Sequence, residues 1–310
     1  MVQKLIRFFG LGPQRSGSTW LDVCLRQHPQ CALPVKTKET FFFDRYFDRG
    51  LCWYERQFDV GREVRAVGEV APSYFGYPDA PIRIAQLFPE ARLIVTLRNP
   101  IERAWSHFLH LWRKGDVSEN FDEAIHLCPE ILERGLYYQH ISVYDRYFAD
   151  SNMLCLKYET IHNDPAAHID RLLRFIKVAT EFHPQSLHSI VNASEVPRSR
   201  LLSACATLVS RKLHAIGLHD IVNVAKTLGF YRMVYHSGVR PPLQMTLDQR
   251  NRVRNYYESD VRLLSGRLNE DFGSAWFSDT DSSRGSAPLM PQDSPSGSTL
   301  TLAARDRRRR

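Results

Sequence analysis

Long apolar runs are absent from this chain of 310 residues. None of its hydrophobic stretches approaches the roughly 20 residues that a membrane-spanning helix needs. The N-terminus also lacks the basic region, the apolar stretch and the small-residue cleavage site of a secretory signal. These absences predict a protein that lies in the cytoplasm and does not bind membranes.

Cysteine is scarce and shows no pairing pattern. The six cysteines include no C-x-x-C pair, and most lie among apolar neighbours, as small core residues do. The sequence therefore indicates neither a zinc site nor a disulfide framework, and no metal is expected. A large excess of one charge is also missing: the net charge of +7 suits an anionic ligand and does not require nucleic acid.

The most informative segment is residues 8–21, F-F-G-L-G-P-Q-R-S-G-S-T-W-L. An apolar run enters a turn rich in Gly, Ser and Thr, and a helical pattern follows. Gly12 and Gly17 let the backbone approach an anion closely, and the free N–H groups at the helix start point toward it. Further donors are the hydroxyls of Ser16, Ser18 and Thr19. The segment therefore predicts a phosphate cradle.

This loop lacks the lysine that follows the last glycine of nucleoside triphosphatase loops, because Ser18 follows Gly17. Its cation precedes the glycine, as Arg15. The loop also departs from the G-x-G-x-x-G pattern of dinucleotide-binding folds. We therefore expect a phosphate-like ligand other than a triphosphate.

Three short apolar runs predict strands over residues 5–11, 92–97 and 152–157, each followed by a helical pattern. This alternation is typical of a parallel α/β sheet with helices on both faces. The helical patterns cover residues 19–27, 100–113, 121–127, 138–148, 166–176 and 247–268, with a helical pair over 201–230.

The chain is expected to form one domain over residues 1–277. Residues 278–310 are rich in Ser and Pro and end in an arginine run, which predicts a disordered tail. A solvated tail is the preferred interpretation of this run, ahead of a nucleic-acid or membrane contact.

A second motif spans residues 93–108, L-I-V-T-L-R-N-P-I-E-R-A-W-S-H-F. Asn99 is placed to cap the helix and Pro100 to start it. Arg98 ends the strand, at the sheet edge where open α/β folds bind ligands, so we expect it to face the same crevice as Arg15. Three- and four-residue spacings place on one helix face Arg103, Ser106, His110 and Arg113.

Together these motifs resemble the sulfotransferase family that uses 3′-phosphoadenosine 5′-phosphosulfate (PAPS). Residues 14–20, Q-R-S-G-S-T-W, are similar to the family's 5′-phosphosulfate loop, and L-R-N-P-x-x-R-A-x-S is similar to its 3′-phosphate element. The resemblance implies a three-layer, P-loop-like α/β fold with a central, mainly parallel sheet flanked by helices. It also implies that PAPS is held by the 3′-phosphate ligands Arg98 and Ser106 and by the loop residues Arg15, Ser16, Gly17, Ser18 and Thr19.

A third segment, K-E-T-F-F-F-D at residues 38–44, resembles the K-E-P-H-F-F-D box of heparan sulfate sulfotransferases. Glu39 matches the catalytic carboxylate of that group, which removes the acceptor proton. His110 matches a site histidine of the N-sulfotransferase branch and is a candidate to assist proton transfer; a structural histidine is the alternative. Similarities at residues 69–75, 156–159 and 268–273 extend the resemblance from residue 4 to about 277.

Three departures from the family pattern bear on function. Arg15 stands where the heparan-type loop usually has Lys, and a fixed cation donates a proton poorly, so the group that protonates the leaving group is left unassigned. Val70 replaces a substrate-site Lys, which disfavours an acidic glycosaminoglycan acceptor. No late K-G-R loop occurs, and Arg198 is expected to supply the remaining 3′-phosphate contact, although an arginine capping the next helix has the same pattern.

The sequence therefore predicts an enzyme that moves a sulfuryl group from PAPS to a hydroxyl or amine of a small-molecule or carbohydrate acceptor and releases PAP. It indicates no oligomeric state. An ATP-dependent small-molecule kinase is one alternative, which the missing loop lysine opposes. A non-catalytic nucleotide-binding scaffold is another, which Glu39 between the two cofactor motifs opposes.

Overall fold

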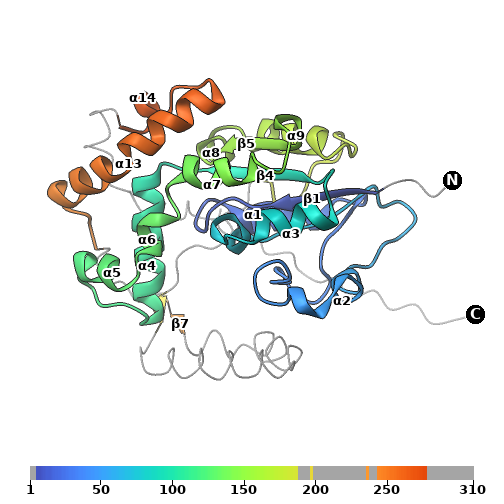
Figure 1. Cartoon of the computed structure of the whole chain (residues 1–310), viewed down its shortest axis with the longest axis horizontal. Helices are drawn as coiled ribbons and strands as arrows, with labels where there is room; N and C mark the ends of the chain where they lie inside the picture. Colours follow the sequence, from blue (N-terminus) through green and yellow to red (C-terminus); the bar gives the residue numbers. More distant parts are fainter. Residues whose placement is uncertain (1–4, 188–195, 198–234, 237–242, 278–310) are drawn as a thin grey trace, which may run out of the picture. The chain divides into compact units, whose positions relative to one another are not determined.

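The computed structural model describes residues 5–187, 196–197, 235–236 and 243–277. Its centre is a sheet of five parallel strands in the order β2-β3-β1-β4-β5 (Figure 1). The strands are β1 (Ile6–Gly10), β2 (Cys31–Ala32), β3 (Ala66–Val70), β4 (Arg92–Leu97) and β5 (Met153–Lys157). A separate antiparallel pair joins β6 (Val196–Pro197) to β7 (Tyr235–His236). The expected helical pair at 201–230, Arg198 and the tail at 278–310 lie outside the described residues.

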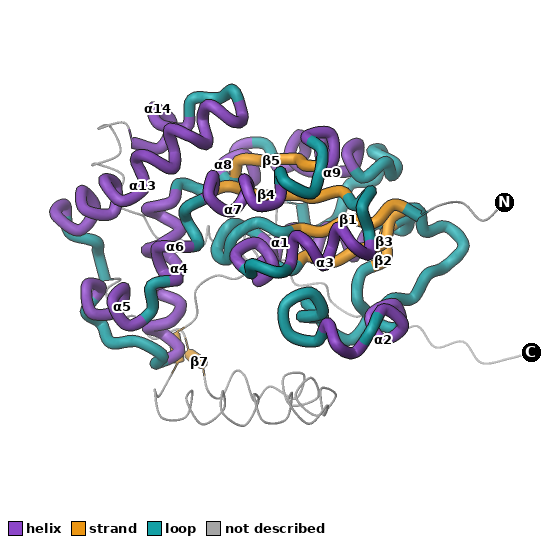
Figure 2. The backbone as a smooth tube through the Cα atoms, in the orientation of Figure 1, coloured by secondary structure: helices purple, strands orange, loops and turns teal. Residues whose placement is uncertain are grey.

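Helices cover both faces of the sheet, which confirms the three-layer α/β prediction (Figure 2). Side chains of a strand alternate between its two faces. In β4, Leu93 and Val95 enter one core, whereas Ile94 enters the other. The first core also takes side chains from α3 (Ala80–Leu87), α4 (Pro100–Lys114), α7 (Tyr137–Tyr144), α13 (Leu247–Leu268) and α14 (Phe272–Phe277); the second takes them from α1 (Ser18–Gln27), α8 (Glu159–Asn163) and α9 (Pro165–Phe175).

Most predicted helices are present within two residues of their expected bounds, and α5 (Phe121–Leu127) and α13 match them. The predicted helix over 138–148 is too long, because α7 ends at Tyr144. The apolar periodicity continues to Phe148 since that ring is buried from the turn after the helix. The remaining short helices are α2 (Leu51–Glu55), α6 (Glu130–Glu133), η1 (Phe47–Arg49), η2 (Pro72–Gly76) and η3 (Asp150–Asn152).

Strand β3 was not predicted, because Gly68 and Glu69 interrupt its apolar run A-V-G-E-V. The structure explains the glycine: a Cβ at Gly68 would lie 1.9 Å from the carbonyl oxygen of Phe8 in β1. Strand β3 is buried throughout and pairs with β1 on one side and β2 on the other. Close backbone approach, invisible in the sequence, therefore selects this residue.

The carboxyl ends of the parallel strands all meet at one edge of the sheet, where ligands bind in open α/β folds. Along this edge lie residues 11–17 after β1, residues 98–99 after β4, and Tyr158 after β5. Asn99 caps α4 as predicted, since its side chain accepts hydrogen bonds from the amides of Ile101 and Glu102, and Pro100 occupies the first turn. The two predicted motifs therefore share one edge.

Candidate active site

The loop between β1 and α1 packs closely on its neighbours, which explains its glycines. A Cβ at Gly12 would lie 2.8 Å from the amide nitrogen of Thr96. Gly17 has a left-handed φ of 84°, and a Cβ there would lie 2.8 Å from Cδ1 of Ile161. Arg15 is also left-handed, with φ 75°. These backbone conformations turn the chain into α1 and shape the predicted cradle.

The cradle contains a buried hydroxyl that lacks a protein partner. Ser16 is 2% exposed, and its Oγ makes no hydrogen bond within the described part of the chain. Helix α1 begins two residues later at Ser18, so the amides of its first turn have no intrahelical acceptors. A buried orphan donor beside a helix N-terminus suits an anion such as the phosphosulfate end of PAPS.

Two arginines connect this loop to β4 and α4. The Nε of Arg15 donates to Oγ of Ser106 at 3.1 Å, and Nη1 of Arg98 donates to the carbonyl oxygen of Arg15 at 3.0 Å. The guanidinium of Arg98 lies 4.7 Å from the ring centre of Tyr158. Burial, together with Arg98 and Arg113, lowers the pKa of Arg15. Among the described residues no carboxylate pairs with Arg15 or Arg98, so this group of cations suits an anionic ligand.

Glu39 lies near the N-terminus of α1, next to a lysine. The Nζ of Lys38 donates to Oγ of Ser18 at 3.1 Å and lies 3.5 Å from Oε1 of Glu39. Burial raises the pKa of Glu39, and the neighbouring Lys38 opposes that rise. The Glu39 side chain remains 20% exposed. It is therefore a partly exposed carboxylate close to the cradle.

A buried network fixes the loop that carries Glu39. Glu69 of β3 is fully buried and accepts hydrogen bonds from the amide and the hydroxyl of Thr40, at 2.8 and 2.9 Å, and from the hydroxyl of Tyr74 at 2.9 Å. Burial raises the pKa of Glu69 to about 7. Phe41 follows with a left-handed φ of 53°. The position of Glu39 is thus set by its neighbour Thr40, which is bound to the central sheet.

His110 lies one turn beyond Ser106 on α4. Burial, followed by the charges of Lys114, Arg15 and Arg113, lowers the pKa of His110 to about 3. The imidazole is therefore neutral near pH 7, which makes it a weak base that can still donate or accept a hydrogen bond.

The structure brings most of the predicted residues to one edge. The cradle residues, Arg98 and Ser106 lie together, and Glu39 reaches the cradle through Lys38 and Ser18. Sequence reasoning gave Lys38 and Glu69 no role in the site, and it left Tyr158 out because an aromatic residue that ends a buried strand is more often a core residue. Tyr158 directly follows strand β5 as Arg98 follows β4, and this shared position at the carboxyl edge is the signal in its favour. Among the described residues, no cluster of three or more His, Cys, Asp or Glu side chains could hold a metal ion.

Comparison with known proteins agrees with this geometry. The family model described as a sulfotransferase domain matches residues 6–212. Heparan sulfate glucosamine 3-O-sulfotransferase 6 of Mus musculus is 32% identical over 184 residues, which cover 56% of this chain and 53% of the relative. The solved structure of a sulfotransferase from Alicyclobacillus acidocaldarius has a TM-score of 0.62 at 23% identity and covers 88% of this chain and 99% of that one, which establishes the fold.

The chain thus spans about half the length of the 3-O-sulfotransferases that it matches. Another relative, 33% identical over 138 residues that cover 42% of this chain and 29% of the relative, is the membrane-associated sulfotransferase kil1 of Dictyostelium discoideum. The membrane association of this last relative points away from the cytoplasmic location that the sequence predicted, and that prediction is wrong. That expectation rested on missing apolar runs, and the composition of a folded domain does not report its compartment. Within the described residues, no helix is both long and apolar enough to cross a bilayer.

Proposed function

The chain belongs to the sulfotransferase family, and on that premise we propose that it transfers a sulfuryl group from PAPS to a hydroxyl or amine of an acceptor and releases PAP. The observation that carries this proposal is the contact set at the carboxyl edge of the sheet. There Arg15, Arg98 and Ser106 contact one another from three segments. The cradle beside them contains the buried Ser16 hydroxyl, which has no hydrogen-bond partner among the described residues.

In this proposal the two ends of PAPS, the 5′-phosphosulfate and the 3′-phosphate, bind to different elements. The amides of the α1 N-terminus and the hydroxyls of Ser16, Ser18 and Thr19 bind the 5′-phosphosulfate end. Arg98 and Ser106 bind the 3′-phosphate, with Arg198, outside the described residues, as a further proposed ligand. Tyr158, whose ring lies under the Arg98 guanidinium, is placed to contact the adenosine between them.

Bound PAPS supplies a sulfuryl group attached to a phosphate leaving group. Glu39 acts as a general base: it takes the proton of the acceptor as the oxygen or nitrogen of the acceptor attacks sulfur. Arg15 and the loop amides stabilise charge on the transferring group, and the cradle holds it in line for attack. His110, neutral near pH 7, donates a hydrogen bond to the acceptor.

A carbohydrate is the proposed class of acceptor. The support is that relatives 32% and 31% identical to this chain are named as heparan sulfate glucosamine 3-O-sulfotransferases. Val70 carries no charge where that group has a substrate lysine, so a less acidic carbohydrate fits this chain better than heparan sulfate.

The first test is the thermal unfolding of the whole chain with PAP and with ATP plus Mg²⁺. A ligand that binds only the folded state raises its stability by mass action, about 2.7 kcal/mol at 100 times Kd. We expect PAP to raise the melting temperature and ATP plus Mg²⁺ to leave it unchanged. Stabilisation by ATP alone would replace this proposal with the kinase.

The second test is transfer from ³⁵S-labelled PAPS to a panel of heparan sulfate, neutral oligosaccharides and 4-nitrophenol. Labelled oligosaccharide is the expected product, and labelled 4-nitrophenol without labelled sugar would favour a small-molecule acceptor. PAP binding without transfer to any acceptor or to water would leave the non-catalytic scaffold as the function.

A further inference from the structure

Lys38 occupies an unusual position for a cation. It follows Ser18 by twenty positions in the sequence, yet its ammonium donates to Ser18 Oγ at 3.1 Å, at the first residue of α1. The N-terminus of a helix carries a partial positive charge and repels cations. No acidic residue stands in the first turn of α1 to offset this repulsion. A lysine held there indicates that other negative charge belongs at the same place.

Two carboxylates of the protein face this ammonium, and they do not fill its bonding capacity. Oε1 of Glu39 is 3.5 Å away, which is longer than a normal hydrogen bond. Asp22, in the next turn of α1, interacts electrostatically with Lys38, but its Oδ2 accepts a hydrogen bond from Nε of Arg26 at 2.8 Å. An ammonium has three donors, so Lys38 retains bonding capacity directed at the cradle.

The cradle needs a group of this kind. As the bond between sulfur and the bridging oxygen breaks, an electron pair goes to the phosphate oxygen, and a proton or strong donor there assists departure. Arg15 is a fixed cation that keeps its protons, and its Nε is bound to Ser106. A lysine ammonium can both bind this oxygen and release a proton to it.

We propose that Lys38 binds and protonates the departing 5′-phosphate oxygen. It thereby takes the place of the lysine that heparan-type loops have at the position of Arg15. The same residue also accepts the proton that Glu39 has taken from the acceptor. This inference rests on the proposed sulfuryl transfer, because it assigns the leaving-group chemistry of that reaction.

The proposed proton path is balanced without a further reactant. The acceptor O–H bond breaks, its proton passes to the Glu39 carboxylate, and the new O–S bond forms. The S–O bond to phosphate breaks, its electron pair stays on the phosphate oxygen, and Lys38 donates a proton to that oxygen. Glu39 then returns its proton to the neutral Lys38 amine across the 3.5 Å between them. Both side chains regain their starting charge, and the acceptor proton leaves on PAP.

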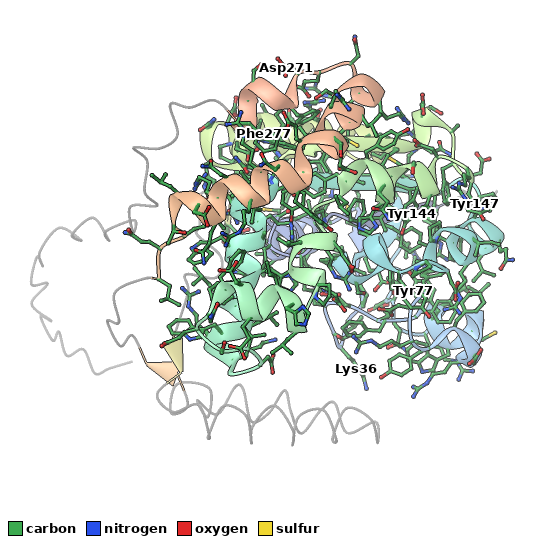
Figure 3. The ribbon with its side chains drawn as sticks, turned by 60° about the vertical axis from the view of Figure 1, so that its left-hand side comes forward. Lys36, Tyr77, Tyr144, Tyr147, Asp271 and Phe277 are labelled. Atoms are coloured by element: carbon green, nitrogen blue, oxygen red, sulfur yellow. The ribbon has the colours of Figure 1, made fainter. Side chains whose placement is uncertain are left out.

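Binding measurements test whether Lys38 faces the 5′-phosphate without use of turnover. The probes are PAP and adenosine 3′-phosphate, which differ only in the 5′-phosphate. We expect the native protein to bind PAP at least 100-fold more tightly, and Lys38→Met to reduce this ratio at least tenfold. Lys36→Met is the matched control, because Lys36 is an exposed lysine at the periphery of the same loop (Figure 3). An unchanged ratio in Lys38→Met overturns the proposal.

Turnover tests whether Lys38 transfers a proton or supplies charge alone. Lys38→Arg keeps the charge and the preference for PAP, but we expect release of PAP from PAPS to fall at least 100-fold. Added methylamine should restore part of the activity of Lys38→Ala, because a free amine can enter the vacated space. A Lys38→Arg variant within threefold of the native kcat, or no rescue by the amine, contradicts proton transfer.

The controls separate this inference from the proposed function. A native protein that neither prefers PAP nor releases it from PAPS contradicts sulfuryl transfer itself. A native protein that does both, with Lys38 variants that behave like Lys36 variants, contradicts the role of Lys38 alone. Thermal unfolding of each variant in the absence of ligand shows whether it is folded.

Discussion

Two carboxyl groups lie near the candidate site, and their surroundings give them different capacities. Glu69 is fully buried and accepts hydrogen bonds from three donors of Thr40 and Tyr74, so it supports the fold of the loop. Glu39 is partly exposed, and its Oε1 lies 3.5 Å from the ammonium of Lys38. A general base must come within hydrogen-bond reach of the proton that it removes, and the exposed part of Glu39 allows this whereas the burial of Glu69 does not.

Glu39→Gln should therefore separate turnover from binding. The amide keeps the size of the side chain but has no basic oxygen, so we expect kcat to fall by at least about 100-fold. The dissociation constant of PAP should change less than threefold, because the proposed ligands of PAP are on other residues. Isothermal titration with PAP and the initial rate of PAP release measure the two quantities. A parallel loss of both would contradict the role of a base.

Arg98→Ala, in contrast to Glu39→Gln, should weaken PAP binding. Loss of a charged hydrogen-bonding partner of a phosphate costs about 2–3 kcal/mol, or roughly 30- to 150-fold in Kd. Arg92→Ala is the matched control, since Arg92 starts the same strand β4 and stacks on Phe175 at the amino edge. Equal PAP affinity in the two variants would remove Arg98 from the proposed site.

At the scale of elements, the site depends on how tightly the loop before α1 packs on β4 and α8. Gly17 and Gly115 have nearly the same left-handed backbone, with φ 84° and 81°, at the start of α1 and the end of α4. Gly115 is exposed, whereas a Cβ at Gly17 would meet Ile161 at 2.8 Å and the ring of Tyr158 at 3.2 Å. The two positions therefore differ in packing and not in backbone strain.

Alanine at either glycine should lose about 1–2 kcal/mol of unfolding free energy from the left-handed backbone. Gly17→Ala should lose more than Gly115→Ala, because its Cβ displaces Ile161 and Tyr158, and it should also weaken PAP binding. Urea denaturation and titration with PAP measure these effects. If both variants have the same unfolding free energy and the same PAP affinity, the close packing of this loop contributes neither to stability nor to PAP binding.

At the scale of the whole molecule, buried histidines link stability to pH. Burial lowers the pKa of His107 and His110 to about 3 and that of His168 to about 4, from an ordinary value of 6.5. Between these values the unfolded chain binds more protons than the folded one. Stability therefore rises with pH through this window, and it is lost as pH falls below about 6.5.

His168→Asn should reduce this pH dependence. The Nδ1 of His168 hydrogen-bonds Thr160, and its Nε2 is buried without a partner among the described residues, so the fold disfavours a second proton. Its contribution between pH 6.5 and 4 is at most about 3 kcal/mol. Urea midpoints at pH 7, 6 and 5 should fall less steeply in His168→Asn than in the native protein. His126→Asn, at an exposed position of α5, is the control, and parallel slopes for both variants would refute the assignment.

The sequence alone was enough to predict the α/β class, the strand–loop–helix units at residues 6–27 and 92–114, and the placement of Arg15 and Arg98 at one edge of a parallel sheet. These features are local. Glycine spacing, an Asn-Pro cap and apolar periodicity depend on residues close together in the sequence, and they indicate the same local structure in many folds. The compartment was predicted wrongly, because composition reports the folded domain and not its location. Strand β3 was missed because its Gly68 is required by the close approach of β1, a contact that the local sequence does not show.

Only the tertiary structure decided which residues share the site. Lys38 contacts Ser18 at the start of α1 across 20 positions, and the Arg98 guanidinium lies over the ring of Tyr158 across 60 positions. Glu69 and Thr40 are likewise joined across 29 positions. Such distances depend on the order of the strands and the path of the loops. Side-chain chemistry is therefore readable from the chain, but the pairing that gives it a function arises from the packing of segments far apart in sequence.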